Sequence, residues 1–177
     1  MNFALHSSRH RGFFRFIALA AFALGLAFSA TAAPLKVLFL GDNGLHVPGT
    51  RLRELAPAML ARGIQLVYSE DIDQALRLET LKRYDALMIY ANTTRLESAQ
   101  EQALVDYVTQ GGGLIAVHCA SAAFGNSDRF IALVGGRFKS HQTGTFRTRI
   151  AEPANPVLQG FTGFESWDET YVHDRHN

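Results

Sequence analysis

The chain has 177 residues, of which 47% are hydrophobic and 19% are charged, and its formal net charge is +1. A chain of this length predicts one domain, and its near-balanced charge argues against long-range attraction to nucleic acid or to an anionic membrane surface. Cys119 is the only cysteine in the sequence, which excludes an internal disulfide bond.

The first 32 residues have the composition of a secretory signal peptide. Three arginines and no acidic residue occupy positions 1–16, an apolar run follows at positions 17–30, and the small residues Ala30-Thr31-Ala32 close it. The apolar run is shorter than the roughly 20 residues that span a bilayer, so we expect cleavage after Ala32 rather than anchoring. We therefore expect a mature domain at residues 33–177, located in the periplasm or outside the cell.

Strands and helices are predicted to alternate along the mature domain. Short apolar runs predict four strands, at residues 35–40, 64–68, 84–90 and 114–118. Segments with helical spacing separate them, which favours an α/β fold with a doubly wound, mostly parallel sheet covered by helices on both faces. Beyond residue 128 the pattern predicts a short helix at residues 129–134, a Gly135-Gly136 turn and a strand at residues 146–150.

Two of the predicted helices carry signals about where they begin. The helix at residues 50–62 contains Pro57, so we expect it either to kink there or to begin at Ala56. A capping box formed by Thr94 with Glu97, or by Ser98 with Glu101, is expected at the start of the helix that ends before Gly111-Gly112-Gly113.

Polar side chains follow three of the predicted strands. Asp42 and Asn43, with His46 close behind, follow the first strand, Asn92 follows the third, and His118 ends the fourth. Ligands of open α/β sheets bind outside the carboxyl ends of the strands, so these residues are candidates for a binding site. Asp, Asn and Gly are also ordinary turn formers, and both interpretations stay open for Asp42, Asn43 and Asn92.

His118 is the most specific of these candidates. Ala116 and Ala120 lie two positions before and after it, and a tight strand-to-helix elbow needs small residues at those two places. The corresponding neighbours of Cys119 are Val117 and Ser121, which places the predicted elbow at His118 and not at the cysteine. The alternative is a hydrogen-bonded histidine at the edge of the core.

Five motifs in this order resemble the ThuA (trehalose-utilisation) family: G-D-N-G, G-G-G-L-I-A-V-H, G-G-R-F-K-S-H, N-P-V-L-Q-G-F and D-E-T-Y. The resemblance implies a flavodoxin-like fold similar to class I glutamine amidotransferases, and a role with trehalose-like disaccharides or their keto derivatives. The chain departs from the family pattern in two respects. Amidotransferase-like relatives have a cysteine at the elbow, where this chain has His118, and family members usually continue well past D-E-x-Y. The chain is therefore expected to lack a C-terminal part of the domain.

The resemblance and the strand-end residues together give the candidate site. The residues with a candidate catalytic role are His118, His141 and Glu169, and those with a substrate-binding role are Asp42, Asn43, Asn92, Arg137, Asp168 and Tyr171. Asp168 and Glu169 are adjacent, so on an extended segment only one can face a pocket, and Glu169 is favoured. Arg137 could clamp a substrate oxygen or form a surface ion pair.

Several functions are compatible with this site. The favoured one is hydrolase or isomerase chemistry on a carbohydrate, the second is a non-catalytic sugar-binding or assembly module, and the third is a cysteine-dependent amidohydrolase using Cys119, which the flanking residues disfavour. His118, His141 and His173 with Asp168 or Glu169 would suit zinc or manganese, but their spacing matches no short metal motif. No cofactor is assigned, the expected partner is a small carbohydrate and not nucleic acid or membrane, and the oligomeric state is left open.

Overall fold

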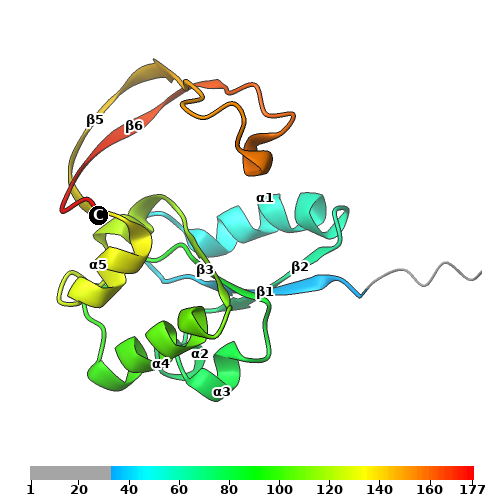
Figure 1. Ribbon diagram of the computed structural model, residues 1–177, viewed down its shortest axis with the longest axis vertical. Coiled ribbons are helices and arrows are strands. Elements are labelled where there is room, and N and C mark those ends of the chain that lie inside the picture. Colours follow the sequence, from blue (N-terminus) through cyan, green and yellow to red (C-terminus); the bar gives the residue numbers. More distant parts are fainter. Residues whose placement is uncertain (1–32) are drawn as a thin grey trace, which may run out of the picture. The chain divides into compact units, whose positions relative to one another are not determined.

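Four parallel strands form the central sheet of the computed structural model, which describes residues 33–177 (Figure 1). The strands are β1 (Leu35–Leu40), β2 (Ile64–Ser69), β3 (Ala86–Ile89) and β4 (Gly113–Ala116), and they lie in the order β2-β1-β3-β4. This order is the beginning of the flavodoxin-like arrangement. The predicted fold class, an α/β domain with a parallel sheet, is thereby confirmed.

Alternation along the strands divides the core between the two faces of the sheet. Val37 and Phe39 of β1 pack with Met88 of β3 on one face, whereas Leu38 and Leu40 point to the other, as the two-residue period of a strand requires. Buried hydrophobic residues on both faces explain why the strands appear in the sequence as nearly continuous apolar runs.

Helices cover both faces, which makes the sheet doubly wound (Figure 1). The helix α1 (Pro48–Leu60) packs on the Phe39 face through Leu52. The other face is covered by the short helices α2 (Ile72–Ala75) and α3 (Leu78–Leu81), by α4 (Ser98–Thr109) and by α5 (Asp128–Val134). None of the helices within residues 33–177 is long and apolar enough to cross a membrane.

The alternative start at Ala56 and both expected capping-box pairs were wrong. The first helix begins at Pro48 and continues through Pro57 to Leu60. Proline is tolerated at the start because N–H groups in the first turn have no partner within the helix. The capping box of α4 lies between the two expected pairs: Glu97 accepts from the backbone of Gln100, and the Gln100 side chain accepts the Glu97 N–H at 2.9 Å. Glutamate here provides the acceptor that a serine or threonine usually supplies.

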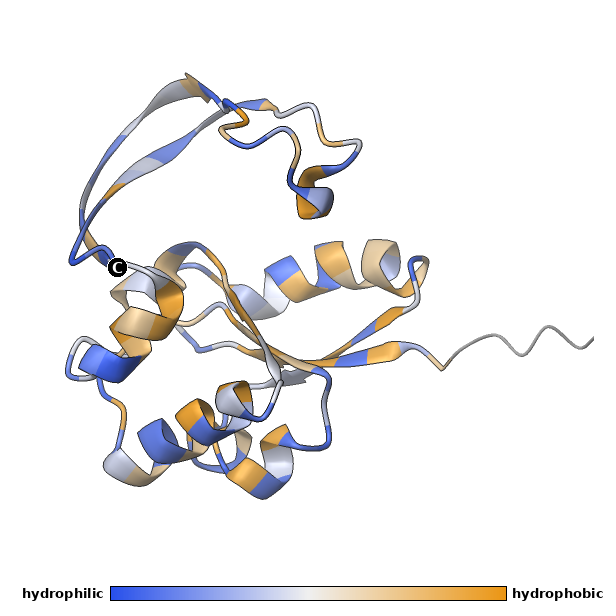
Figure 2. Ribbon diagram, viewed as in Figure 1, coloured by the Kyte–Doolittle hydropathy of each residue, from blue (hydrophilic) through white to orange (hydrophobic). Residues whose placement is uncertain are grey.

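A second, two-stranded sheet follows α5, and the sequence did not predict it. The strands β5 (Arg137–Arg147) and β6 (Glu165–Asp174) pair in antiparallel fashion, and the short 3₁₀ turn η2 (Pro156–Leu158) lies in their connection. The expected strand at residues 146–150 was therefore wrong, since it lies mostly beyond β5. Figure 2 shows that this hairpin is mainly hydrophilic, so it lacks the apolar run that marked the other strands.

The signal-peptide prediction concerns residues 1–32, which lie outside the described residues.

Candidate functional site

The loops that follow β1, β3 and β4 meet at the carboxyl edge of the sheet. The connections from β1 and β3 leave toward opposite ends of the sheet, which makes this edge the topological switch point where α/β folds bind ligands. The Asp42 carboxylate ties two of the loops together, because it accepts the backbone N–H of Gly44 at 2.9 Å and that of Asn92. Asp42 therefore holds the edge of the site in place.

Gly41 is needed for this loop to leave β1. A Cβ at position 41 would lie 2.8 Å from the Pro48 Cβ and 2.5 Å from the Tyr68 hydroxyl. The Tyr68 side chain could turn away, but the Pro48 Cβ is fixed in its ring and could move only with α1, so glycine allows the loop to pass this close to α1.

His118 has a backbone conformation that is unusual for a residue other than glycine. The strand β4 ends at Ala116, two residues earlier than expected, and His118 begins the 3₁₀ turn η1 (His118–Ala122) with a φ of 49°. Residues in this region cost conformational energy and are concentrated at functional sites. Ala120 is fully buried in the turn, and it is one of the two positions at which an elbow centred on His118 needs a small residue.

The His118 ring contacts three side chains. Its Nε2 lies 3.2 Å from the Tyr171 hydroxyl and 3.5 Å from Glu169 Oε2, and the His46 ring stands edge-on to it with the centroids 4.7 Å apart. Burial lowers the pKa of His118 below its ordinary value of about 6.5 and His46 lowers it further, while Glu169 acts in the opposite direction. The imidazole is therefore neutral near pH 7.

Glu169 lies between two histidines. Its Oε2 faces His118, and its Oε1 lies 3.6 Å from the Nε2 of His141. Strand alternation on β6 places Glu169 and Tyr171 on the side of His118, while the Asp168 carboxylate accepts the backbone N–H of Glu169 at 2.8 Å. Burial, followed by the Glu169 charge, raises the pKa of Tyr171 above its usual value, so that its hydroxyl stays protonated.

His46, His118 and Glu169 line a polar pocket of about 760 Å³, which lies within the size range of small-molecule sites, whereas Tyr171 and His141 are not among its lining residues. The residues lining this polar pocket are Leu45, His46, Arg51, Tyr90, His118, Thr143, Trp167, Asp168 and Glu169. Both adjacent carboxylates belong to this lining, so the expectation that only one of Asp168 and Glu169 would face a pocket was wrong. His46 was noted in the sequence only as a strand-end candidate without a role, and Arg51, Tyr90 and Trp167 were not predicted at the site. The available signals were the position of His46 just after the G-D-N-G turn and of Trp167 directly before D-E-T-Y.

Of the six predicted binding residues, only Asp168 lines the polar pocket. Tyr171 contacts His118, and the Asp42 carboxylate accepts backbone N–H groups. Arg137 forms two bonds with the Asp174 carboxylate, at 3.1 and 3.3 Å, at the end of the hairpin, and it does not line the polar pocket. Asn43 is exposed, and the bond of Asn92 to Asp42 uses its backbone N–H.

Cys119 is 1% exposed, and burial raises the pKa of its thiol to about 12. A protonated, inaccessible thiol is a poor nucleophile, which weighs against an amidohydrolase.

The histidines do not form a metal-binding group with the carboxylates. His173, the third candidate ligand, contacts the Ser121 hydroxyl through its Nε2 at 3.0 Å. Within residues 33–177 no group of three or more His, Cys, Asp or Glu side chains has an arrangement that could hold a metal ion.

The model of one protein family, ThuA, described as trehalose utilisation, matches residues 36–177. The chain belongs to the ThuA family. The resemblance that the five motifs suggested is thus confirmed, and membership in the ThuA family connects the chain with trehalose utilisation.

Two solved structures of ThuA-like proteins have a similar fold. One, from Bacteroides uniformis, has 21% sequence identity and a TM-score of 0.69 over 86% of this chain, and the other, from Parabacteroides merdae, has 14% identity and a TM-score of 0.61 over 80%. The aligned parts make up 66% and 63% of those two proteins, so the chain spans about two thirds of their length. No curated protein matches the sequence.

Proposed function

We propose that this ThuA protein acts on a carbohydrate, a trehalose-like disaccharide or a keto-sugar derivative, by hydrolase or isomerase chemistry centred on His118. The observation that carries the proposal is the position of His118 Nε2, which has the Tyr171 hydroxyl at 3.2 Å and the Glu169 carboxylate at 3.5 Å. Tyr171 can donate a hydrogen bond to the unprotonated nitrogen, and Glu169 can stabilise the protonated one. A ring nitrogen with a partner for each of its two states suits proton transfer.

The proposed roles follow from charge and protonation. Neutral His118 accepts a proton from a sugar hydroxyl, from water or from a carbon next to a ketone, and Glu169 stabilises the imidazolium that forms. Tyr171, held protonated by its raised pKa, donates a hydrogen bond. His141, on the other side of Glu169 at 3.6 Å, completes a chain of titratable groups along which the proton can leave.

The polar pocket supports a sugar ligand through its other residues. Sugars present many hydroxyl groups, and Arg51, Thr143 and Asp168 offer donors and acceptors around the pocket. Trp167 is 71% exposed at the same pocket, where its flat ring offers an apolar surface for the face of a sugar. Aromatic side chains with a few polar groups are typical of small-molecule sites.

A screen for turnover tests the proposal. The purified protein is incubated with trehalose, other disaccharides and their keto derivatives, and products are followed by NMR between about pH 5 and pH 8, the range in which a histidine changes charge. Turnover of at least one compound, abolished in His118→Ala, is the expected result. Saturable binding without turnover at any pH would instead make the protein a sugar-binding module, and the absence of both would overturn the proposal.

A further inference from the structure

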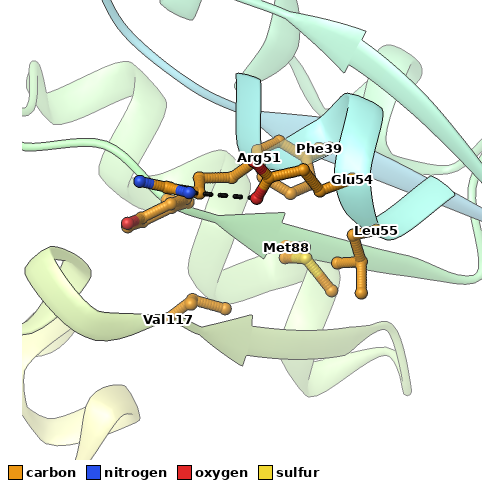
Figure 3. A pocket seen from close by; sticks show the side chains of 7 residues that line it. Phe39, Arg51, Glu54, Leu55, Met88 and Val117 are labelled. Carbon is orange, nitrogen blue, oxygen red and sulfur yellow. Dashed lines mark hydrogen bonds and ion pairs between the residues drawn. The ribbon is translucent and has the colours of Figure 1, made fainter. Parts of the chain in front are cut away.

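An apolar pocket lies beside the polar pocket, between α1 and the sheet (Figure 3). Its volume is about 430 Å³, and its aliphatic and aromatic lining includes Phe39, Leu55, Met88 and Val117. Phe39 and Met88 are 2% and 5% exposed and form the packed floor, whereas Leu55 on α1 is 36% exposed at the rim. A pocket with this lining favours a hydrocarbon group.

The two pockets are adjacent. Arg51 and Tyr90 line both of them, and the centroid of the Tyr90 ring lies 6.0 Å from that of His118. Because the pockets share these two side chains, one ligand that contacts His118 with a polar group can place a second group in the apolar pocket.

The charged residues of the apolar pocket already neutralise each other, so they do not require a charged group on the ligand. Its two charged side chains, Arg51 and Glu54, pair with each other at 3.0 Å, as the dashed line in Figure 3 marks. The remaining lining offers few hydrogen-bonding groups, so a second sugar ring would lose its hydrogen bonds to water there without adequate replacement.

We propose that the substrate is a glycoside with its sugar in the polar pocket and an apolar aglycone, of the size of a phenyl or hexyl group, in the apolar pocket. This inference rests on the proposed function, because it takes the polar pocket to be the sugar site. Among carbohydrates, it favours sugars that are linked to an aryl or alkyl group over trehalose-like disaccharides.

Calorimetric titration with methyl and hexyl α-D-glucopyranoside tests the inference, since both ligands present the same sugar. We expect the hexyl glucoside to bind at least about tenfold more tightly, because burial of each methylene adds affinity. In Leu55→Asp, a charge at the rim of the apolar pocket should bring this ratio close to one. The matched control is Leu60→Asp, which changes an exposed leucine of the same helix outside both pockets and should keep the wild-type ratio.

The outcomes separate this inference from the proposed function. Equal affinities for the two glucosides, or a ratio that survives in Leu55→Asp, would overturn the apolar subsite while leaving the sugar site intact. If neither glucoside binds, the sugar site itself is wrong and the subsite falls with it. Loss of the ratio in Leu60→Asp as well would assign the effect to α1 in general and contradict the subsite.

Discussion

His118 is only 26% exposed, and its surroundings act on its charge in opposite directions. Burial is the largest influence and lowers its pKa, His46 lowers it too, and Glu169 raises it. A histidine with a lowered pKa stays neutral to lower pH than a free one, because the protonated form is the one that burial penalises. The base that the proposed chemistry needs is therefore present throughout the neutral range.

This environment predicts the pH dependence of activity. The rate should fall on the acid side as His118 becomes protonated, with a midpoint below about 6.5, the value of a free histidine. Glu169→Gln removes a charge that favours the protonated form, so it should move the pKa of His118 to still lower pH. An NMR titration of the histidine ring signals in both proteins measures this, and a shift to higher pH in Glu169→Gln would contradict the assignment of the pair.

The buried side chain of Cys119 leads to a second prediction about a single residue. Because the thiol is buried and its pKa is raised to about 12, Cys119→Ser should leave turnover within a few-fold of the wild type. The native protein should also react with iodoacetamide far more slowly than the same protein in urea. Complete loss of activity, together with labelling that a substrate prevents, would instead support the cysteine-dependent alternative.

At the scale of elements, the β5–β6 hairpin brings Glu169 and Tyr171 to His118. Further contacts hold the hairpin to the rest of the domain: His173 Nε2 lies 3.0 Å from the Ser121 hydroxyl, and Arg175 pairs with Asp128 at 2.6 Å. Since the hairpin is mainly exposed, these polar contacts and the aromatic packing around Tyr171 decide where Glu169 lies.

His173→Ala should loosen the hairpin without unfolding the sheet. The lost hydrogen bond, worth about 1 kcal/mol, should increase amide hydrogen exchange in β6 several-fold while β1 to β4 keep their protection. Val172→Ala, which shortens an exposed side chain on the opposite face of the same strand, is the control and should exchange like the wild type. Equal exchange in the two variants would show that His173 does not anchor the hairpin.

The elements differ in how well the sequence predicted them, and the difference has a physical basis. The strands β1 to β4 are buried in the sheet, and that burial requires apolar runs that can be recognised. The helices α2 and α3 have four residues each, too few to show a helical period. The hairpin is exposed and pairs residues far apart in the chain, such as Arg137 with Asp174, so neither strand has a local signal.

The residues of the candidate site were also predictable only where they have a local sequence signal. His118 could be singled out because the elbow makes local demands on Ala116 and Ala120. The contacts of Glu169 with His118 and His141, by contrast, depend on how the hairpin docks. Asp42 and Arg137 have side-chain types that suit ligand binding, yet one ties backbone groups of two loops together and the other pairs with Asp174. Residue type alone does not distinguish a carboxylate that binds a ligand from one that holds a loop.

For the molecule as a whole, export is the remaining prediction from the sequence. If residues 1–32 are a signal peptide, mass spectrometry of protein recovered from the periplasm or the medium should find Ala33 at the N-terminus. Ala32→Arg replaces the small residue that a signal peptidase requires before the cleaved bond, so it should block processing. An intact N-terminus in the membrane fraction of the wild type would contradict cleavage.

We propose above that His118 and Glu169 together form the carbohydrate site of this ThuA protein. The most direct test is calorimetric titration of the wild type, His118→Ala and Glu169→Gln with the sugar that the wild type binds most tightly, with circular dichroism to verify folding. His176→Ala, a change to a histidine that does not line the polar pocket, is the control. We predict wild-type affinity for the control and at least about tenfold weaker binding, about 1.4 kcal/mol, for the other two variants. Unchanged affinity in folded His118→Ala would contradict the claim.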